Sequence, residues 1–85
     1  MESSEIMREQ IFEVINNQIS DNNPPETRST FQRLMKLGYS EFETKQLIGQ
    51  CVAVELFKVI KNQEPFDENR YVKNLKNLPK EPFDD

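Results

Sequence analysis

The 85-residue sequence contains no histidine, no tryptophan, one cysteine and two glycines. Nucleophilic sites of the Ser-His-Asp and Cys-His types need an imidazole, and a structural zinc site needs about four cysteine or histidine ligands. Phosphate-binding loops need clustered glycines. The chain cannot build any of these sites from its own residues, so we expect a protein that is not an enzyme and carries no metal or other cofactor.

The sequence also lacks the features of secreted and membrane proteins. A single cysteine, Cys51, cannot form a disulfide within the chain and favours an intracellular compartment. Residues 1–10 are acidic and polar, without the basic and apolar segments of a signal peptide. The longest nearly apolar run, residues 51–60, contains Glu55 and Lys58 and is far shorter than the roughly 20 residues of a membrane span. These features predict a soluble cytoplasmic protein with no membrane contact.

Hydrophobic periodicity and helix-ending residues predict four helices. They span about residues 4–20, from Pro24 or Pro25 to before Gly38, about 20 residues from Ser40, and from Asp67 to before Pro79. The third helix is long because no proline occurs between its start and Pro65. We therefore predict an all-α fold, a compact four-helix bundle-like domain over residues 1–79 with a long, largely buried third helix. Residues 80–85 are predicted to form an acidic, mobile tail.

Local signals define several of the helix ends. Ser40 and Glu43 have the spacing of a capping box, in which each side chain bonds the other residue's backbone amide. Gly38 fits the left-handed position that commonly ends a helix. Phe66 and Tyr71 are spaced as a hydrophobic staple across the start of the fourth helix.

The second half of the third helix is apolar on nearly every side over residues 51–60. A helix of this kind is either central in a bundle or covered by another subunit. A 10.1 kDa chain is too small to bury every side of it. The preferred interpretation is a protein that acts through contacts with an unknown protein partner or with a second copy of itself in a homodimer. Gly49, in the middle of the same helix, indicates that the first or second helix crosses closely there.

Polar residues also fall where the pattern predicts burial. Gln18 lies on the apolar face of the first helix, and its amide is expected to bond the backbone of the turn at residues 21–25. Glu55 lies on the apolar face of the third helix and is expected to pair with Lys58 or Arg33. Gln18, Arg33 and Glu55 are therefore the candidate buried polar or partner-contact residues. A ligand contact at Gln18, or an unpaired Glu55 acting as an acid or base, defines the alternative of a small ligand-binding or enzymatic module.

A set of residues along the chain matches a family pattern: Ile15-Asn16-Asn17-Gln18, Pro25-Glu26, Thr30, Arg33-Leu34, Gly38, Ile48, Phe66-Asp67, Tyr71, Leu75 and Leu78-Pro79. Over roughly residues 11–79 the sequence resembles a bacterial family of small helical proteins, known only as domain of unknown function eighteen forty-one. The resemblance implies an all-helical bacterial protein and no activity. The family pattern places histidines near three positions that are Phe12, Phe42 and Gln46 here. A metal or catalytic role of those histidines therefore cannot be carried over.

Two other binding modules share local features with this chain. Residues 37–40, Leu-Gly-Tyr-Ser, resemble the Met-Gly-Phe loop of ubiquitin-associated domains, but the predicted third helix has no break where that fold needs one. The helix, glycine turn and helix also resemble a DNA-binding helix-turn-helix, whose second helix enters the major groove by its N-terminal residues. Here those residues include Glu41 and Glu43, which repel phosphates, and the net charge is -4. Nucleic acid is therefore not the expected partner.

Overall fold

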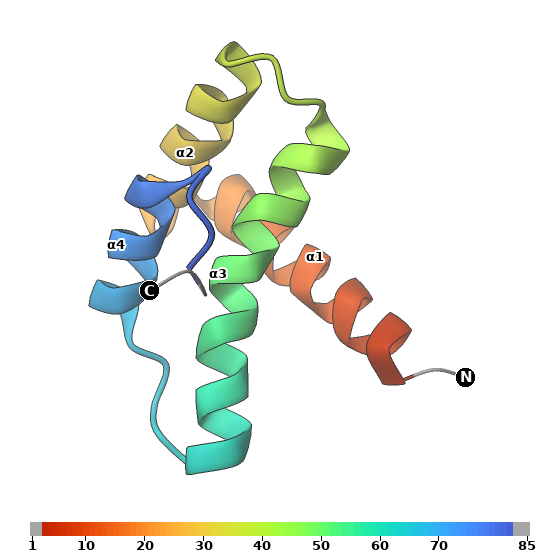
Figure 1. Ribbon diagram of the computed structural model, residues 1–85, viewed down its shortest axis with the longest axis vertical. Coiled ribbons are helices and arrows are strands. Elements are labelled where there is room, and N and C mark those ends of the chain that lie inside the picture. Colours follow the sequence, from red (N-terminus) through yellow and green to blue (C-terminus); the bar gives the residue numbers. More distant parts are fainter. Residues whose placement is uncertain (1–2, 83–85) are drawn as a thin grey trace.

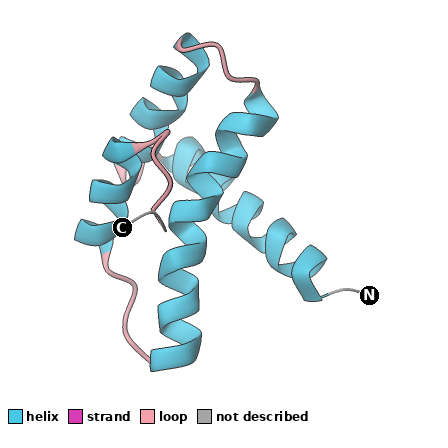
Figure 2. Cartoon of the chain, in the orientation of Figure 1, coloured by secondary structure: helices cyan, strands magenta, loops and turns pink. Residues whose placement is uncertain are grey.

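The computed structural model describes residues 3–82 of the chain. Its helices are α1 (Ser3–Asp21), α2 (Pro25–Lys36), α3 (Glu41–Asn62) and α4 (Glu68–Asn77), and no strand occurs within these described residues (Figures 1 and 2). The predicted all-α class and the long third helix are confirmed, since α3 has 22 residues. Part of the predicted tail, residues 83–85, lies outside the described residues, so its mobility stays a prediction.

The residues predicted to begin and end the helices make the contacts that the sequence predicts. The Ser40 side chain accepts a bond from the amide of Glu43 at 3.1 Å, and the Glu43 carboxylate accepts one from the amide of Ser40 at 2.9 Å. Gly38 has a φ of 106°, and the amide of Tyr39 bonds back to the carbonyl of Leu34, which together close the end of α2. The rings of Phe66 and Tyr71 meet edge to face with centroids 5.4 Å apart.

α3 is the central helix and packs against α1, α2 and α4, while α2 also contacts α1 and α4 (Figure 1). The core between them consists of Ile11, Ile15, Leu34, Ile48, Cys51, Val52, Tyr71, Leu75 and Leu78. α3 is continuous throughout its length, so the break that the ubiquitin-associated fold needs is missing. None of the helices within residues 3–82 combines the length and the apolar character needed to cross a membrane.

α1 crosses α3 at Gly49, as the mid-helix glycine indicated. A Cβ atom at Gly49 would lie 3.2 Å from Cγ2 of Ile11 and 3.8 Å from Cδ1 of Ile15. Glycine therefore permits a closer approach of the two helices than a larger residue would. At this contact the turn of α1 that contains Ile11 and Ile15 lies against Gly49 of α3.

Gly49→Leu should lower the free energy of unfolding by about 1–3 kcal/mol, because the new side chain overpacks the crossing against Ile11. Urea unfolding measures the loss. Gln46→Leu, at an exposed position of the same helix, is the control and should change stability by less than about 0.5 kcal/mol. Equal stability of the wild type and the Gly49 variant would show that α1 does not pack closely at this position.

The end of α3 extends beyond the part that the other helices cover. Thr44, Ile48, Val52 and Glu55 are buried along one face, but residues 59–62 are all exposed. The N-terminal half of α1 diverges from α3 instead of following it (Figure 1). Residues 51–60 of α3 are apolar on nearly every side. The other helices cover the first half of this stretch and leave the second half exposed.

Candidate functional site

Glu55 is fully buried and is paired with Arg70, from the first turn of α4. Nε of Arg70 donates to Oε2 at 2.6 Å, and one terminal nitrogen donates to Oε1 at 2.9 Å. The backbone amide of Asp67 also donates to Oε1, at 2.9 Å. The predicted partners, Lys58 and Arg33, were therefore wrong. The segment after α3 folds back and brings the start of α4, and not the Arg33 end of α2, against this carboxylate.

The ion pair between Glu55 and Arg70 joins α3 to the start of α4. Hydrogen bonding to Glu55 is the main cause that raises the pKa of Arg70 above its usual value. Both carboxylate oxygens accept hydrogen bonds, and the Glu55 side chain is closed off from solvent. A carboxylate held in this way stabilises the fold and is a poor acid or base.

Gln18 joins three helices through one oxygen atom. Its Oε1 accepts hydrogen bonds from the hydroxyl of Thr27 in α2 and from the hydroxyl of Tyr71 in α4, both at 2.7 Å. The predicted amide contacts to the turn at residues 21–25 were wrong, because that turn instead bonds the backbone carbonyl of Gln18 through the amide of Asn23 at 3.0 Å. Burial raises the pKa of Tyr71 to about 12. This network belongs to the core.

Arg33 holds the C-terminal end of α4. Its two terminal nitrogens donate to the carbonyl of Leu78 at 2.8 Å and to the carbonyl of Leu75 at 2.9 Å. Carbonyls at the end of a helix lack partners within the helix, and a cation is favoured there. Arg33 therefore acts between α2 and α4 and not on Glu55.

The candidate residues thus occupy three separate structural positions and do not form one site. Sequence reasoning missed their partners Thr27, Arg70 and Tyr71. A signal for Arg70 was present, because a cation in the first turn of a helix is opposed by the helix dipole and needs a nearby carboxylate. No comparable signal identified Thr27 or Tyr71 as partners of Gln18.

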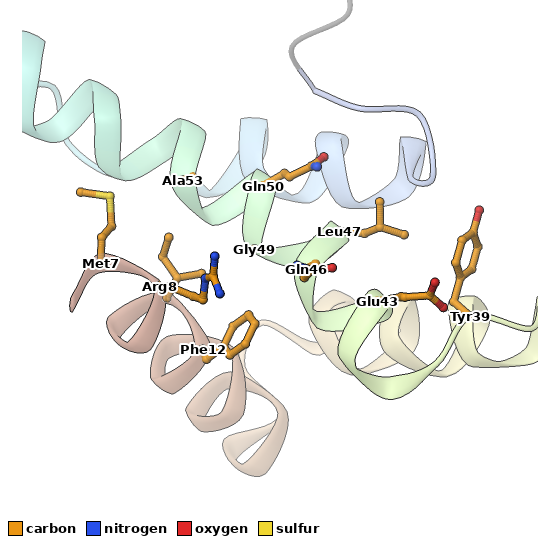
Figure 3. Close-up of a pocket in the computed structure, with 11 residues that line it drawn as sticks. Met7, Arg8, Phe12, Tyr39, Glu43, Gln46, Leu47, Gly49, Gln50 and Ala53 are labelled. Carbon is orange, nitrogen blue, oxygen red and sulfur yellow. The ribbon is translucent and has the colours of Figure 1, made fainter. Parts of the chain in front are cut away.

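An open cavity of about 570 Å³ lies between α1 and the first half of α3 (Figure 3). It is lined from α1 by Met7, Arg8, Ile11 and Phe12, and from α3 and the loop before it by Tyr39, Glu43, Gln46, Leu47, Gly49, Gln50 and Ala53. Most of the exposed lining surface is apolar, although four of the side chains are polar or charged: Arg8, Glu43, Gln46 and Gln50. Oε1 of Gln50 is buried and has no hydrogen-bond partner within residues 3–82. The cavity is therefore a largely apolar groove whose lining also contains polar and charged side chains.

The apolar lining continues along α3 beyond the cavity. Leu56, Phe57 and Ile60 follow Ala53 by three, four and seven positions, which places them on the same side of the helix. Phe57 and Ile60 are 61% and 68% exposed, and Met7, which shares the cavity with Ala53, is 42% exposed. We refer to Met7, Ala53, Leu56, Phe57 and Ile60 as the α1/α3 surface.

Two of the three positions at which the resemblance places histidines, Phe12 and Gln46, line the same groove. The rings of Phe12 and Phe42 meet edge to face with centroids 6.0 Å apart, and Gln46 lines the cavity together with Phe12. Among the residues that the structure describes, no group of three His, Cys, Asp or Glu side chains could hold a metal ion.

Comparison with known proteins gives a family but no function. No curated protein and no solved structure matches the chain. A family model described as "Domain of unknown function (DUF1841)" matches residues 9–77, which include all of α2, α3 and α4 and most of α1. The chain therefore belongs to the DUF1841 family, a domain of unknown function.

Proposed function

We propose that this protein is a non-enzymatic helical module that binds another protein chain through the α1/α3 surface. The exposure of Phe57 and Ile60 on the helix that forms the centre of the fold carries this proposal. An apolar patch beside a groove is typical of a protein interaction site in a soluble protein. We place the protein in the cytoplasm, where the single cysteine, buried at Cys51, stays reduced.

The polar residues support a role without catalysis. Glu55 accepts two hydrogen bonds from Arg70 and one from a backbone amide, and Gln18 accepts hydrogen bonds from two hydroxyl groups. Burial raises the pKa of the Cys51 thiol to about 12, which keeps it protonated and unreactive at neutral pH. The groups that an enzyme would use, at Glu55, Gln18 and Cys51, are therefore hydrogen-bonded or buried within the fold.

The DNA-binding alternative has less support. The first turn of α3 would enter the major groove in a helix-turn-helix, and it exposes Glu41 and Glu43. Glu41 pairs with Lys45 at 3.0 Å, so the nearest cation on this helix is already engaged. A protein partner fits the apolar surface better than a polyanion fits this acidic helix end.

Photo-crosslinking in the cells that produce the protein tests this proposal. A benzophenone amino acid in place of Phe57 should give a covalent adduct heavier than 10.1 kDa. Leu37 is a matched control, because it has the same 61% exposure but lies on the loop after α2. An adduct at position 57 and none at position 37 supports the proposal. Absence of an adduct at position 57, or equal adducts at both positions, contradicts it.

A further inference from the structure

The sulfur atom of Met35, near the end of α2, accepts a hydrogen bond from the start of α3. The hydroxyl of Thr44 donates to Sδ of Met35 at 3.6 Å. Thr44 lies in the first turn of α3 and is fully buried, so its hydroxyl cannot exchange this partner for water. A thioether sulfur is a weak acceptor, but here it is the acceptor of a buried donor. The bond joins α2 to α3 across the loop at residues 37–40.

The Met35 side chain is also open to solvent. It is 40% exposed and lines an open hollow on α2 together with Phe31 and Leu37. A thioether sulfur has two lone pairs, and the hydroxyl of Thr44 engages one of them. The second lone pair points away from Thr44, which leaves it free to react with an oxidant in the solvent.

We propose that Met35 is a site of reversible oxidation, at which hydrogen peroxide reacts with the lone pair turned away from Thr44. The sulfur attacks one peroxide oxygen, and an S–O bond forms as the O–O bond breaks. The sulfur loses two electrons, the peroxide gains them, and the proton of the transferred oxygen passes to the second oxygen, which leaves as water. The product is methionine sulfoxide, a chiral group that methionine sulfoxide reductases convert back to methionine.

Oxidation should break the bond between Met35 and Thr44. The sulfur of a sulfoxide carries a partial positive charge, and its oxygen becomes the acceptor. Because that oxygen points away from Thr44, the buried hydroxyl is left without an acceptor, which destabilises the folded state. The oxidation site shares no residue with the α1/α3 surface, so the failure of either proposal leaves the other in place.

Met7 provides a matched control within the same chain. Its exposure, 42%, is nearly the same as that of Met35. Among residues 3–82, no donor bonds the sulfur of Met7 as Thr44 bonds that of Met35. A general sensitivity of exposed methionines would therefore affect both residues alike, whereas an effect of Thr44 would appear only at Met35.

Treatment of the complete 85-residue protein with hydrogen peroxide tests the direction of attack. Cleavage after glutamate then places Met7 in residues 6–9 and Met35 in residues 27–41, so that mass spectrometry measures the two sulfoxides separately. Each of the two methionine sulfoxide reductases accepts one sulfoxide epimer, so using one enzyme at a time gives the epimer ratio. At Met35 one epimer should exceed the other at least about threefold, the bias expected from one ordinary hydrogen bond.

Met7 in the folded protein, and Met35 in protein oxidised in concentrated urea, should give the two epimers in similar amounts. Thr44→Val, which removes the hydroxyl, should also bring the epimers at Met35 to similar amounts. Similar amounts at Met35 in the folded wild type would overturn the proposal. A bias that persists in Thr44→Val would overturn it as well, because a different group would then direct the attack.

The effect on stability is tested with Met35→Leu, a substitution of similar volume that peroxide cannot oxidise. Peroxide should lower the urea midpoint of the wild type, and the two reductases together should restore it. The midpoint of Met35→Leu should stay unchanged after the same treatment, although Met7 is oxidised in both proteins. An equal fall in both proteins, or no fall in the wild type, would contradict the loss of the bond to Thr44.

Discussion

Arg70→Met should lower the free energy of unfolding by about 3–5 kcal/mol, because it leaves the buried carboxylate of Glu55 without its cation. Only the backbone amide of Asp67 would still donate to that carboxylate. The loss should also loosen the connection between α3 and α4, since Arg70 supplies two of the bonds that join them. Urea unfolding at pH 7 gives the free energy of both proteins.

The double variant Glu55→Leu with Arg70→Met separates the pair from the packing around it. Removing both charges should recover a large part of the loss, because a buried ion pair contributes little compared with apolar groups of similar volume. Lys73→Met, an exposed cation in the same helix, is the control and should stay within about 0.5 kcal/mol of the wild type. A loss below about 1 kcal/mol for Arg70→Met would contradict the buried pairing.

At alkaline pH the protein should lose about 3 kcal/mol of stability between pH 10 and pH 12 through Tyr71 alone. Burial raises the pKa of Tyr71 from 10.0 to about 12. In that interval the unfolded chain releases the phenolic proton and the folded chain retains it, so the stabilisation is complete below pH 10 and is lost as the pH rises. Cys51, whose pKa is raised from 9.0 to about 12, should add to this loss from pH 9 upward.

Tyr71→Phe provides the control for the alkaline loss. At neutral pH it should cost about 1 kcal/mol, since it removes the hydrogen bond to Gln18. Above pH 10 its stability should fall less steeply than that of the wild type, because the phenol is gone. Urea midpoints of both proteins, measured at each pH unit from 7 to 12, test this difference. Parallel curves for the two proteins would contradict burial of the tyrosine hydroxyl.

Features that depend on neighbouring residues could be predicted from the sequence. The capping box at Ser40, the end of α2 at Gly38 and the staple of Phe66 on Tyr71 each join residues at most five positions apart. Gly49 indicated the helix crossing because a glycine in the middle of a helix is unfavourable unless a close approach requires it. These signals gave the number, order and approximate ends of the helices.

The partners of the buried polar residues could not be predicted in the same way. Glu55 and Arg70 are 15 positions apart, and Gln18 and Tyr71 are 53 apart. Which side chain reaches which depends on how the helices pack, and one helix face offers several chemically equivalent donors. Lys58 lies on the same helix as Glu55, but Arg70 provides a planar group that bonds both carboxylate oxygens at once. Local pattern therefore gave the burial of Glu55 but not its partner, and Gln18 is only half-buried.

The apolar stretch at residues 51–60 was ambiguous for a related reason. Periodicity shows that every side of this part of α3 is apolar, but it does not show how far the other helices extend along it. The two halves differ in burial. Cys51, Val52 and Glu55 are buried, whereas Phe57 and Ile60 are exposed. The interaction proposal therefore rests on Phe57 and Ile60, in the second half.

Native mass spectrometry of the gently purified protein tests the proposed contact surface most directly, because it reports subunit number and retained partners together. We expect a species heavier than 10.1 kDa that contains a second copy or another protein, and we expect Phe57→Glu to convert it to the bare chain of 10.1 kDa. A wild type that is found only as a bare 10.1 kDa chain, with no second copy and no other protein attached, would contradict a role for the α1/α3 surface in binding.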